Sequence, residues 1–408
     1  MALKAGPIRE SSAVRRLIEN RTRPDDFVSS VGSRTILLLG VHSLCAGGTE
    51  RVVSTLLEIF SDVEHLDVHC ILYGRQPTCF YDAPTGVTLH RPPFEFDAFS
   101  RATATLKTIR FIRKVSQSLR PAAFLNFGER WNNLVLVSTR GTRVPVFVAD
   151  RSSPAKPLGR VHEPLRRRLY ARSAGVIVQT REAAERMSSI VNGRVPVHVI
   201  PNPLFQIPEP VRSPRRREVL FVGRLIPSKH VDRLIRIFER ARHGDWRLMI
   251  VGGDAQGFSE MGNLRELLRA RELESSVELA GTQRDVQRFY RRASIFAFPS
   301  SSEGFPNALA EALSFGLPSV AYDCSAGPSD LIEDGRNGFL VPVFDDETFA
   351  RRLENLMNDA DLRGRMSQRA VASVARLEKV RIAQRFLDAC EIGGSIVPQG
   401  AVGEARAE

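Results

Sequence analysis

The sequence has few cysteines, and no two of them form a Cys-x-x-Cys pair. The five cysteines, Cys45, Cys70, Cys79, Cys324 and Cys390, are odd in number and widely scattered. This distribution argues against a disulfide framework and against a zinc site, and it favours a reducing cytosol.

Long apolar runs are also missing. The longest one near the start, Ile36 to Val41, is far too short to span a bilayer. It lies too deep in the chain, and lacks the small-residue cleavage site, to be a signal peptide. With 408 residues, 43% hydrophobic and 25% charged, the chain fits a soluble globular protein of two domains.

Lysine is rare, and the basic character comes from arginine. Only six of the 58 basic residues are lysine, and the formal net charge is +12. A basic surface attracts nucleic acid, anionic lipid or phosphorylated substrates. No helix-turn-helix, zinc finger or aromatic RNA-binding pattern accompanies the charge, so we expect no nucleic-acid partner.

The most informative stretch follows the apolar run Ile295 to Phe298, which is typical of a buried strand. A polar loop comes next, and Pro306 suits the first position of a helix that Gly316 and Pro318 end. A loop and helix start of this kind offer free backbone N–H groups and a positive dipole end to a phosphate. Glu303 in the loop and Glu311 in the helix are placed to accept hydrogen bonds from sugar hydroxyls, a combination that suits a nucleotide-sugar.

Two glutamates eight positions apart also occur by chance in charged chains, so their context has to carry the argument. Here they stand as Glu303-Gly-Phe-Pro-Asn-Ala-Leu-Ala-Glu311, directly after a strand. In this form the sequence resembles the retaining glycosyltransferases of family 4. The resemblance implies a GT-B fold, in which two Rossmann-like doubly wound α/β domains face each other across a cleft.

The order of apolar runs and turns agrees with two such domains. Strands alternate with helices in each half, which predicts parallel sheets covered on both faces. Prolines at 201, 203, 208, 210 and 214 mark the boundary between the halves. We therefore expect the following division: a polar, mobile tail at 1–33, an acceptor domain at 34–203, a Pro-rich linker at 204–217, a nucleotide-sugar donor domain at 218–380, and a C-terminal helix and tail at 381–408. The resemblance implies that this last helix crosses to the first domain.

Two glycine-containing loops follow strands that open the two halves. In the first, Gly47-Gly48-Thr49-Glu50-Arg51 begins a helix; the spacing alone fits an ordinary turn equally well. In the second, Gly223-Arg224-Leu-x-x-x-Lys229 supplies a guanidinium and an ammonium, which bind phosphate well but are also common on solvated surfaces.

The resemblance assigns roles to these residues. It implies that Arg224 and Lys229 neutralise the leaving diphosphate, that Glu303 faces the transferred hexose, and that Glu311 accepts hydrogen bonds from ribose hydroxyls. Stabilisation of the leaving group by preorganised charge is then the main catalytic effect. The donor-binding set that it implies is Gly47, Gly48, Gly223, Arg224, Lys229, Gly253, Thr282, Glu303, Gly304, Phe305, Pro306, Asn307, Ala308 and Glu311. We expect neither a metal nor a cofactor besides the donor.

The first half departs from the family pattern. Many relatives carry a histidine after a mid-domain strand, whereas here the strand Val146 to Ala149 runs into Asp150 and Arg151. A histidine role therefore cannot be transferred. The candidates for the acceptor side are His42, Glu50, Glu129 and Arg151.

Two further patterns bear on the substrates. The basic stretch from Arg151 to Arg172 is an ordinary solvated face or a contact for anionic lipid or a lipid diphosphate acceptor. The segment Cys324-Ser-Ala-Gly-Pro-Ser-Asp-Leu-Ile332 resembles a variant found in transferases of N-acetylhexosamine or galactose, which points to a UDP-sugar.

These observations predict a retaining, metal-independent glycosyltransferase that moves a hexose or N-acetylhexosamine from a UDP-sugar to a glycan or lipid-linked acceptor in surface polysaccharide biosynthesis. We expect a cytoplasmic protein at the inner face of the membrane. Two alternatives remain open: a nucleotide-sugar epimerase or phosphorylase-like enzyme of the same fold, and a non-catalytic subunit that binds nucleotide-sugar.

Overall fold

The computed structural model describes residues 34–45, 47–75, 81–153, 156–204, 214–241, 244–255 and 257–396. The expected tail at 1–33, most of the expected linker, Cys79 and the residues after 396 lie outside this range.

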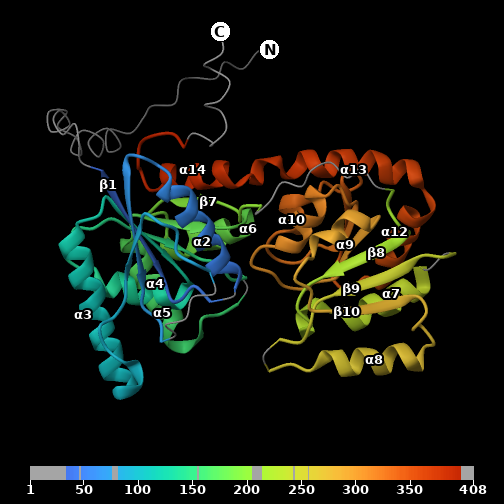
Figure 1. The fold of residues 1–408 in the computed structure, drawn as a ribbon, viewed down its shortest axis with the longest axis horizontal. Coiled ribbons are helices and arrows are strands. Elements are labelled where there is room, and N and C mark those ends of the chain that lie inside the picture. The colour runs from blue at the N-terminus through green and yellow to red at the C-terminus, as the bar shows by residue number, and fades with distance from the viewer. Residues whose placement is uncertain are drawn as a thin grey trace, which may run out of the picture. The chain divides into compact units, whose positions relative to one another are not determined.

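The first half contains a sheet of seven parallel strands in the order β3-β2-β1-β4-β5-β6-β7 (Figure 1). Its strands are β1 (Thr35–Val41), β2 (Leu66–Leu72), β3 (Val87–His90), β4 (Ala123–Phe127), β5 (Val146–Ala149), β6 (Gly175–Val178) and β7 (Val197–Val199). The central strands are short apolar runs because both faces of the sheet are covered. Leu37 and Leu39 of β1 pack in one hydrophobic cluster and Leu38 in the cluster on the opposite face.

Helices connect these strands and cover the two faces. They are α2 (Gly48–Ser61), η2 (Phe96–Ala98), α3 (Arg101–Leu119), α4 (Glu129–Ser138), α5 (Gly159–Leu169), η3 (Tyr170–Arg172) and α6 (Arg181–Val191). Helices α3 and α6 begin at side-chain caps, because Ser100 accepts from the N–H of Thr103 and Thr180 from the N–H of Ala183.

The second half contains a sheet of six parallel strands in the order β10-β9-β8-β11-β12-β13. Its strands are β8 (Glu218–Val222), β9 (Arg247–Val251), β10 (Val277–Gly281), β11 (Ile295–Phe298), β12 (Ser319–Tyr322) and β13 (Gly338–Val341). Its helices are η4 (Pro227–Lys229), α7 (Val231–Ala241), α8 (Glu260–Ala270), α9 (Gln287–Arg292), α10 (Asn307–Ser314), α11 (Pro328–Leu331) and α12 (Asp346–Asn358). The expected architecture of two Rossmann-like sheets is therefore confirmed.

One detail of the signature stretch differs from the expectation. Helix α10 begins at Asn307, and Pro306 precedes it as the N-cap residue with φ −82° and ψ 71°. The ring of Pro306 packs closely against Gly327, where a Cβ would lie 2.3 Å from Pro306 Cδ. Pro306 therefore lies just before the first helical turn, whereas the sequence pattern placed it at the first helical position.

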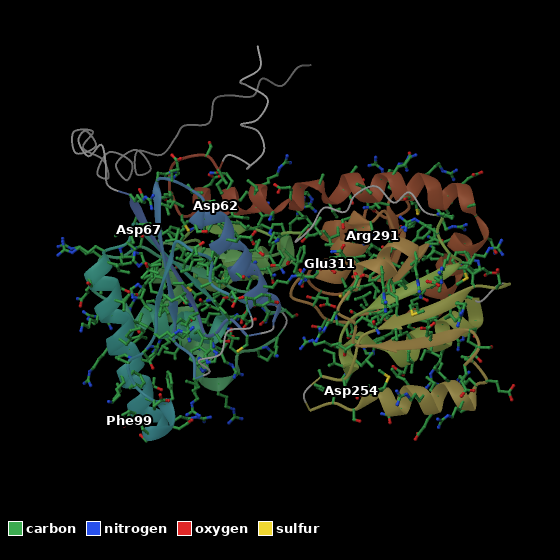
Figure 2. The ribbon with its side chains drawn as sticks, in the orientation of Figure 1. Asp62, Asp67, Phe99, Asp254, Arg291 and Glu311 are labelled. Atoms are coloured by element: carbon green, nitrogen blue, oxygen red, sulfur yellow. The ribbon has the colours of Figure 1, made fainter. Side chains whose placement is uncertain are left out.

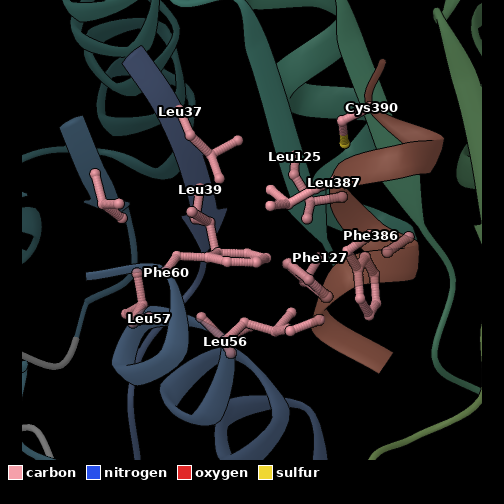
Figure 3. Close-up of a cluster of buried hydrophobic side chains, with 14 of the residues drawn as sticks. Leu37, Leu39, Leu56, Leu57, Phe60, Leu125, Phe127, Phe386, Leu387 and Cys390 are labelled. Atoms are coloured by element: carbon pink, nitrogen blue, oxygen red, sulfur yellow. The ribbon is translucent and has the colours of Figure 1, made fainter. Parts of the chain in front are cut away.

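The chain ends with α13 (Ala360–Val374), η5 (Ala375–Leu377) and α14 (Lys379–Ala389), which follow one another along the top of the view in Figure 1. Helix α13 contributes Ala370 and Val374 to a cluster of the second half, whereas α14 contributes Ile382, Phe386 and Leu387 to a cluster of the first. Figure 3 shows Phe386 and Leu387 facing side chains of β1 and β4. The last helix thus packs on the first sheet.

Among the described residues, no helix combines the length and the apolar character needed to cross a bilayer.

Candidate functional site

Each sheet has one switch point, where the strand order reverses and the two adjacent strands are followed by connections on opposite sides of it. In the first sheet it lies between β1 and β4, and in the second between β8 and β11. Ligands of open α/β sheets bind outside the carboxyl ends of strands at such switch points. The loops after these strands contain Gly47, Arg224 and Glu303, and Glu129 begins the helix after β4, so the topology brings the predicted motifs to the two expected crevices.

A cavity of about 480 Å³ lies between the loops of the two halves. Of the predicted donor set, it is lined by Gly47, Gly48, Gly223, Arg224, Lys229, Glu303, Gly304, Phe305, Pro306, Asn307 and Ala308. Arg151, which was expected on the acceptor side, also lines it, together with Thr49, Gln179, Asn202, Val222 and Phe298.

Lys229 and Glu303 form an ion pair in this cavity, with Lys229 Nζ donating to Glu303 Oε1. Their side chains are only 14% and 12% exposed, so the pair is substantially removed from water. The Lys229 ammonium also lies 5.3 Å from the centroid of the Phe298 ring. Because each charge neutralises the other, an anionic ligand at Lys229 would share that ammonium with Glu303.

Arg224 is exposed at the end of β8, where the backbone turns tightly. The N–H of Leu225 donates to the carbonyl of Gly253 at 2.9 Å, which ties this loop to the one after β9. A Cβ on Gly252, whose φ is 150°, would lie 1.8 Å from the carbonyl oxygen of Gly223. The glycine at 252 therefore permits the close approach of these two loops.

Two helix starts face the cavity. Gly47 is the N-cap of α2, and the ideal Cβ of Gly48 lies 3.9 Å from Nδ2 of Asn307 at the start of α10. The first N–H groups of a helix lack intrahelical partners and carry the positive end of its dipole. Together with the two cationic side chains, this arrangement can bind a phosphate group.

A polar network joins the loop after β11 to the first half. A Cβ on Gly304 would lie 2.4 Å from the carbonyl oxygen of Arg151, so only glycine allows this approach. Arg151 Nη1 donates to Asn202 Oδ1 at 3.2 Å, and Asn202 Nδ2 donates to Asn307 Oδ1 at 2.9 Å. Gln179 Nε2 donates to the same Asn202 Oδ1 at 2.7 Å.

Glu311, labelled in Figure 2, lies on α10. Residues of both halves pair with it. Arg51 Nη1 of α2 is 3.4 Å from its Oε1, and the Tyr290 hydroxyl donates to its Oε2 at 3.1 Å. Burial raises the pKa of Glu311, and Arg51 and Tyr290 oppose this shift. Glu311 is not among the residues that line the cavity.

Several other predicted residues also lie outside the lining of the cavity. Gly253 and Thr282 are neighbours, since a Cβ on Gly253 would lie 2.3 Å from Thr282 Oγ1. The Glu50 carboxylate lies against Gly47, where a Cβ would be 2.1 Å from its Oε2. His42 stacks on Trp131, with ring centroids 4.3 Å apart.

Glu129 acts on the backbone of the neighbouring loop. Its Oε1 accepts from the N–H groups of Arg151 and Ser152, both at 2.5 Å. It therefore fixes the loop after β5, whose Arg151 carbonyl contacts Gly304. This is a positioning contact that the sequence pattern did not indicate.

Beneath this loop lies a buried polar chain. Asp150 accepts from the Tyr170 hydroxyl at 2.6 Å and from Asn132 Nδ2 at 3.0 Å. Burial, reinforced by the charge of Glu129, raises the pKa of Asp150 to about 7. This group of buried polar residues could not be predicted from the sequence, because its members are separated along the chain and stand in no motif.

Sequence reasoning also missed Gln179, Asn202 and Tyr290. Asn202 stands in the Pro201-Asn202-Pro203 segment, which we interpreted only as a boundary, and Gln179 directly follows β6. A polar residue at the carboxyl end of a buried parallel strand is a usable signal for a ligand site. Tyr290 lies on a helix and gives no such signal.

Comparison with known families accounts for nearly the whole described chain. Residues 47–203 match the glycosyl transferase 4-like domain, and residues 205–373 match the glycosyl transferases group 1.

Three curated relatives are similar to this chain, two of them over most of their own length and one over part of it. The amylovoran biosynthesis glycosyltransferase AmsD of Erwinia amylovora is 26% identical over 82% of this chain and 93% of its own. An N-acetylgalactosaminyltransferase of Campylobacter jejuni, which acts on a diNAcBac-PP-undecaprenol glycan, is 24% identical over 85% and 96%. An exopolysaccharide phosphotransferase of Streptomyces coelicolor is 34% identical over 53% of this chain, and the match spans only 23% of that protein.

Solved structures share the fold. HepE of Anabaena in complex with UDP superposes with a TM-score of 0.72 at 18% identity, covering 88% of this chain and 99% of that one. The lipopolysaccharide outer core galactosyltransferase WaaB gives a TM-score of 0.70 at 20% identity, covering 87% and 98%. The chain belongs to the group 1 glycosyltransferases with a family 4-like first domain and the GT-B fold, and it is a hexosyltransferase.

Proposed function

We propose that this protein transfers a hexose or N-acetylhexosamine from a UDP-sugar, with retention of configuration, to a glycan or lipid-linked acceptor in surface polysaccharide biosynthesis. In this proposal residues 34–203 form the acceptor domain and residues 218–380 the donor domain. Solved relatives contain UDP and UDP-glucose, and two curated relatives act on glycans linked through diphosphate to undecaprenol, which supports both choices.

The observation that carries the proposal is the charge of the cavity. Arg224, Lys229 and the starts of α2 and α10 all direct positive charge or free N–H groups toward one space. A diphosphate fits this arrangement, because a bidentate guanidinium and a compact ammonium together can neutralise its charge.

The chemistry then depends on the leaving diphosphate. As the bond between the sugar C1 and the phosphate oxygen breaks, negative charge grows on that oxygen, and Lys229 and Arg224 stabilise it. Glu303 orients the Lys229 ammonium and meets the hexose. Glu311 binds the ribose hydroxyls.

Thermal stability with different nucleotides tests the donor assignment. We expect UDP and UDP-sugars to raise the melting temperature more than GDP or ADP compounds do. A ligand at 100 times its Kd stabilises by about 2.7 kcal/mol, which is readily measured. Arg224→Ala should abolish the effect, and Arg236→Ala, an exposed change on α7, should keep it.

The same assay tests the independence from metal. Because Arg224 and Lys229 supply the positive charge, we expect EDTA to leave the UDP shift unchanged. Stabilisation by none of the nucleotides would overturn the proposed donor.

Anomeric analysis of the product by NMR would test retention.

We further propose that the enzyme works at the cytoplasmic face of the membrane, where nucleotide-sugars and lipid-linked acceptors meet. Arg151 and Arg166 of the basic stretch are buried and take no part in this placement. The exposed members support it through their attraction to anionic lipid; they are Lys156, Arg160, Arg167, Arg168 and Arg172.

A further inference from the structure

A second hollow of about 660 Å³, which we call the α3–α4 groove, lies within the first half. Three aromatic or histidine side chains, His42, Tyr73 and Trp131, line one end of it. These residues follow β1, β2 and β4, so this end lies at the carboxyl edge of the sheet, where the candidate site also lies. From there the groove continues between α3, α4 and α5.

The far part of the groove is apolar and open. Val137 of α4 and Leu165 of α5 line it and are 41% and 36% exposed. Leu106 of α3 and Val161 of α5, on two of the same helices, are 54% and 67% exposed. These four residues are the majority of the large hydrophobic side chains exposed in the described part of the chain, so apolar exposure is concentrated on α3, α4 and α5.

The groove is also cationic. Arg75, Arg101 and Arg130 line it, and no carboxylate is among its lining residues. Asp97, outside the lining, lies 3.5 Å from Arg75 in an ion pair that is exposed on both sides. An occupant that complements both features carries negative charge near the arginines and hydrocarbon near Val137 and Leu165.

We propose that the α3–α4 groove binds the diphosphate and the first part of the hydrocarbon chain of a polyprenyl diphosphate-linked acceptor. The arginines hold the diphosphate, the apolar side chains hold the prenyl units, and the glycan extends past Trp131 toward the cavity between the two halves. This inference rests on the proposed function and specifies its acceptor site. A lipid of this kind is favoured over the plain bilayer surface because the groove is a concave hollow that reaches the carboxyl edge of the sheet.

Tryptophan fluorescence provides a direct test. The chain has two tryptophans, Trp131 in the groove and Trp246, which is 4% exposed in the core of the second half. In Trp246→Phe protein, with its fold checked by circular dichroism, Trp131 reports on the groove alone. We expect farnesyl diphosphate to change its emission saturably, with a Kd at least 10-fold lower than that of inorganic pyrophosphate or of farnesol.

Matched variants locate the two parts of the ligand. In the same background, Val137→Asp should raise the Kd for farnesyl diphosphate at least 10-fold, whereas Val371→Asp, an equally exposed change on α13, should not. Arg130→Ala should weaken binding, whereas Arg265→Ala on α8 should not.

Three outcomes would overturn the proposal. They are no saturable change, equal affinity for pyrophosphate alone, and an equal response to vesicles of phosphatidylglycerol without prenyl lipid, which would indicate a membrane-docking face instead. The UDP-induced thermal shift is measured on the same variants and should be unchanged by Val137→Asp. Loss of the groove response with a normal UDP shift therefore sinks only this inference, whereas loss of the UDP shift alone sinks only the donor assignment.

Discussion

At the scale of single residues, the pair of Lys229 and Glu303 decides how charge is arranged in the cavity. Both side chains are mostly buried, and their mutual contact joins the loop after β8 to Glu303. We expect Lys229→Ala to lower kcat about 100-fold, because it removes one preorganised positive charge from the leaving diphosphate. Single-turnover rates at saturating donor measure this effect.

A matched control separates catalysis from stability. Lys379→Ala removes a lysine whose side chain is 40% exposed and pairs with Glu58 at 3.6 Å, and it should leave kcat within about twofold. Lys229→Ala also leaves Glu303 without its partner, so its melting temperature is measured alongside. A Lys229→Ala enzyme with wild-type kcat would show that this ammonium does not act on the leaving group.

Asp150 makes stability depend on pH. Its pKa rises from the ordinary 3.8 to about 7, first because it is buried and then because of the Glu129 charge. The folded protein therefore holds a proton that the unfolded chain has lost, and stability falls as the pH rises from about 4 to about 7. The slope from this group is at most about 1.4 kcal/mol per pH unit.

Replacing Asp150 with Asn should flatten that dependence. The Asn oxygen can still accept from Tyr170 and Asn132, so the fold is retained while the titration disappears. Urea unfolding of both proteins at pH 5, 6 and 7 measures the difference, and groups common to both cancel. Parallel curves for the two proteins would contradict the raised pKa.

The sequence predicted the residues whose signal is local. Arg224, Lys229 and Glu303 stand in short motifs next to apolar strands, and the structure brings them to one cavity. Gln179, Asn202 and Tyr290 could not be found in this way, because each acts through a partner outside its own motif: Asn202, Asn307 and Glu311 respectively. Tertiary packing alone creates these contacts.

At the scale of elements, the alternation of strands and helices followed from periodicity and turn residues, and helix α10 begins after Pro306 rather than at it. Pro306 lies close to Gly327, a tertiary contact that no local pattern contains. The α14 helix shows a larger effect of the same kind. Its apolar face is visible in the sequence, but the sheet that it covers was implied only by the family resemblance.

The packing of α14 can be tested through Phe386. This side chain is fully buried, its ring centroid lies 6.0 Å from that of Phe127, and the Arg151 guanidinium lies 5.3 Å from it. We expect Phe386→Ala to lower the free energy of unfolding by about 3–5 kcal/mol, because it leaves a cavity and removes the ring beside a buried cation. Urea denaturation measures the loss, and Arg381→Ala on the exposed side of the same helix should change it by less than about 0.5 kcal/mol. A small loss for Phe386→Ala would mean that α14 is not part of this core.

At the scale of the whole described region from Thr35 onward, polar contacts join the two halves at several separate points. They include Arg51 with Glu311, Asn202 with Asn307, and Ser302 with Ser153, whose hydroxyls are 3.2 Å apart. Each of these contacts is a single hydrogen bond or ion pair. The arrangement of the two halves in this structure, which we call the closed arrangement, therefore depends on their sum. A donor that touches both halves would shift the population toward this arrangement.

Glu182 offers the clearest test of the coupling between donor binding and the contacts that join the two halves. It lies in the first turn of α6, and its carboxylate accepts from the Ser325 hydroxyl and, at 2.7 Å, from the N–H of Ala326. Glu182 is not among the residues that line the cavity. We expect Glu182→Ala to raise the KM for donor about 3- to 10-fold with little change in kcat, because charge-assisted hydrogen bonds of this kind contribute roughly 1 kcal/mol to the closed state.

Glu185→Ala, one turn later on the exposed side of α6, serves as the control and should leave both constants unchanged. X-ray scattering should show that Glu182→Ala is more expanded than wild type without UDP and equal to it with saturating UDP. If kcat fell and KM stayed constant, Glu182 would act on the chemical step through the loop that carries Cys324. If neither constant changed, the contact between α6 and that loop would not limit closure, and the coupling would have to reside in Arg51 and Asn202, which reach the α10 helix directly.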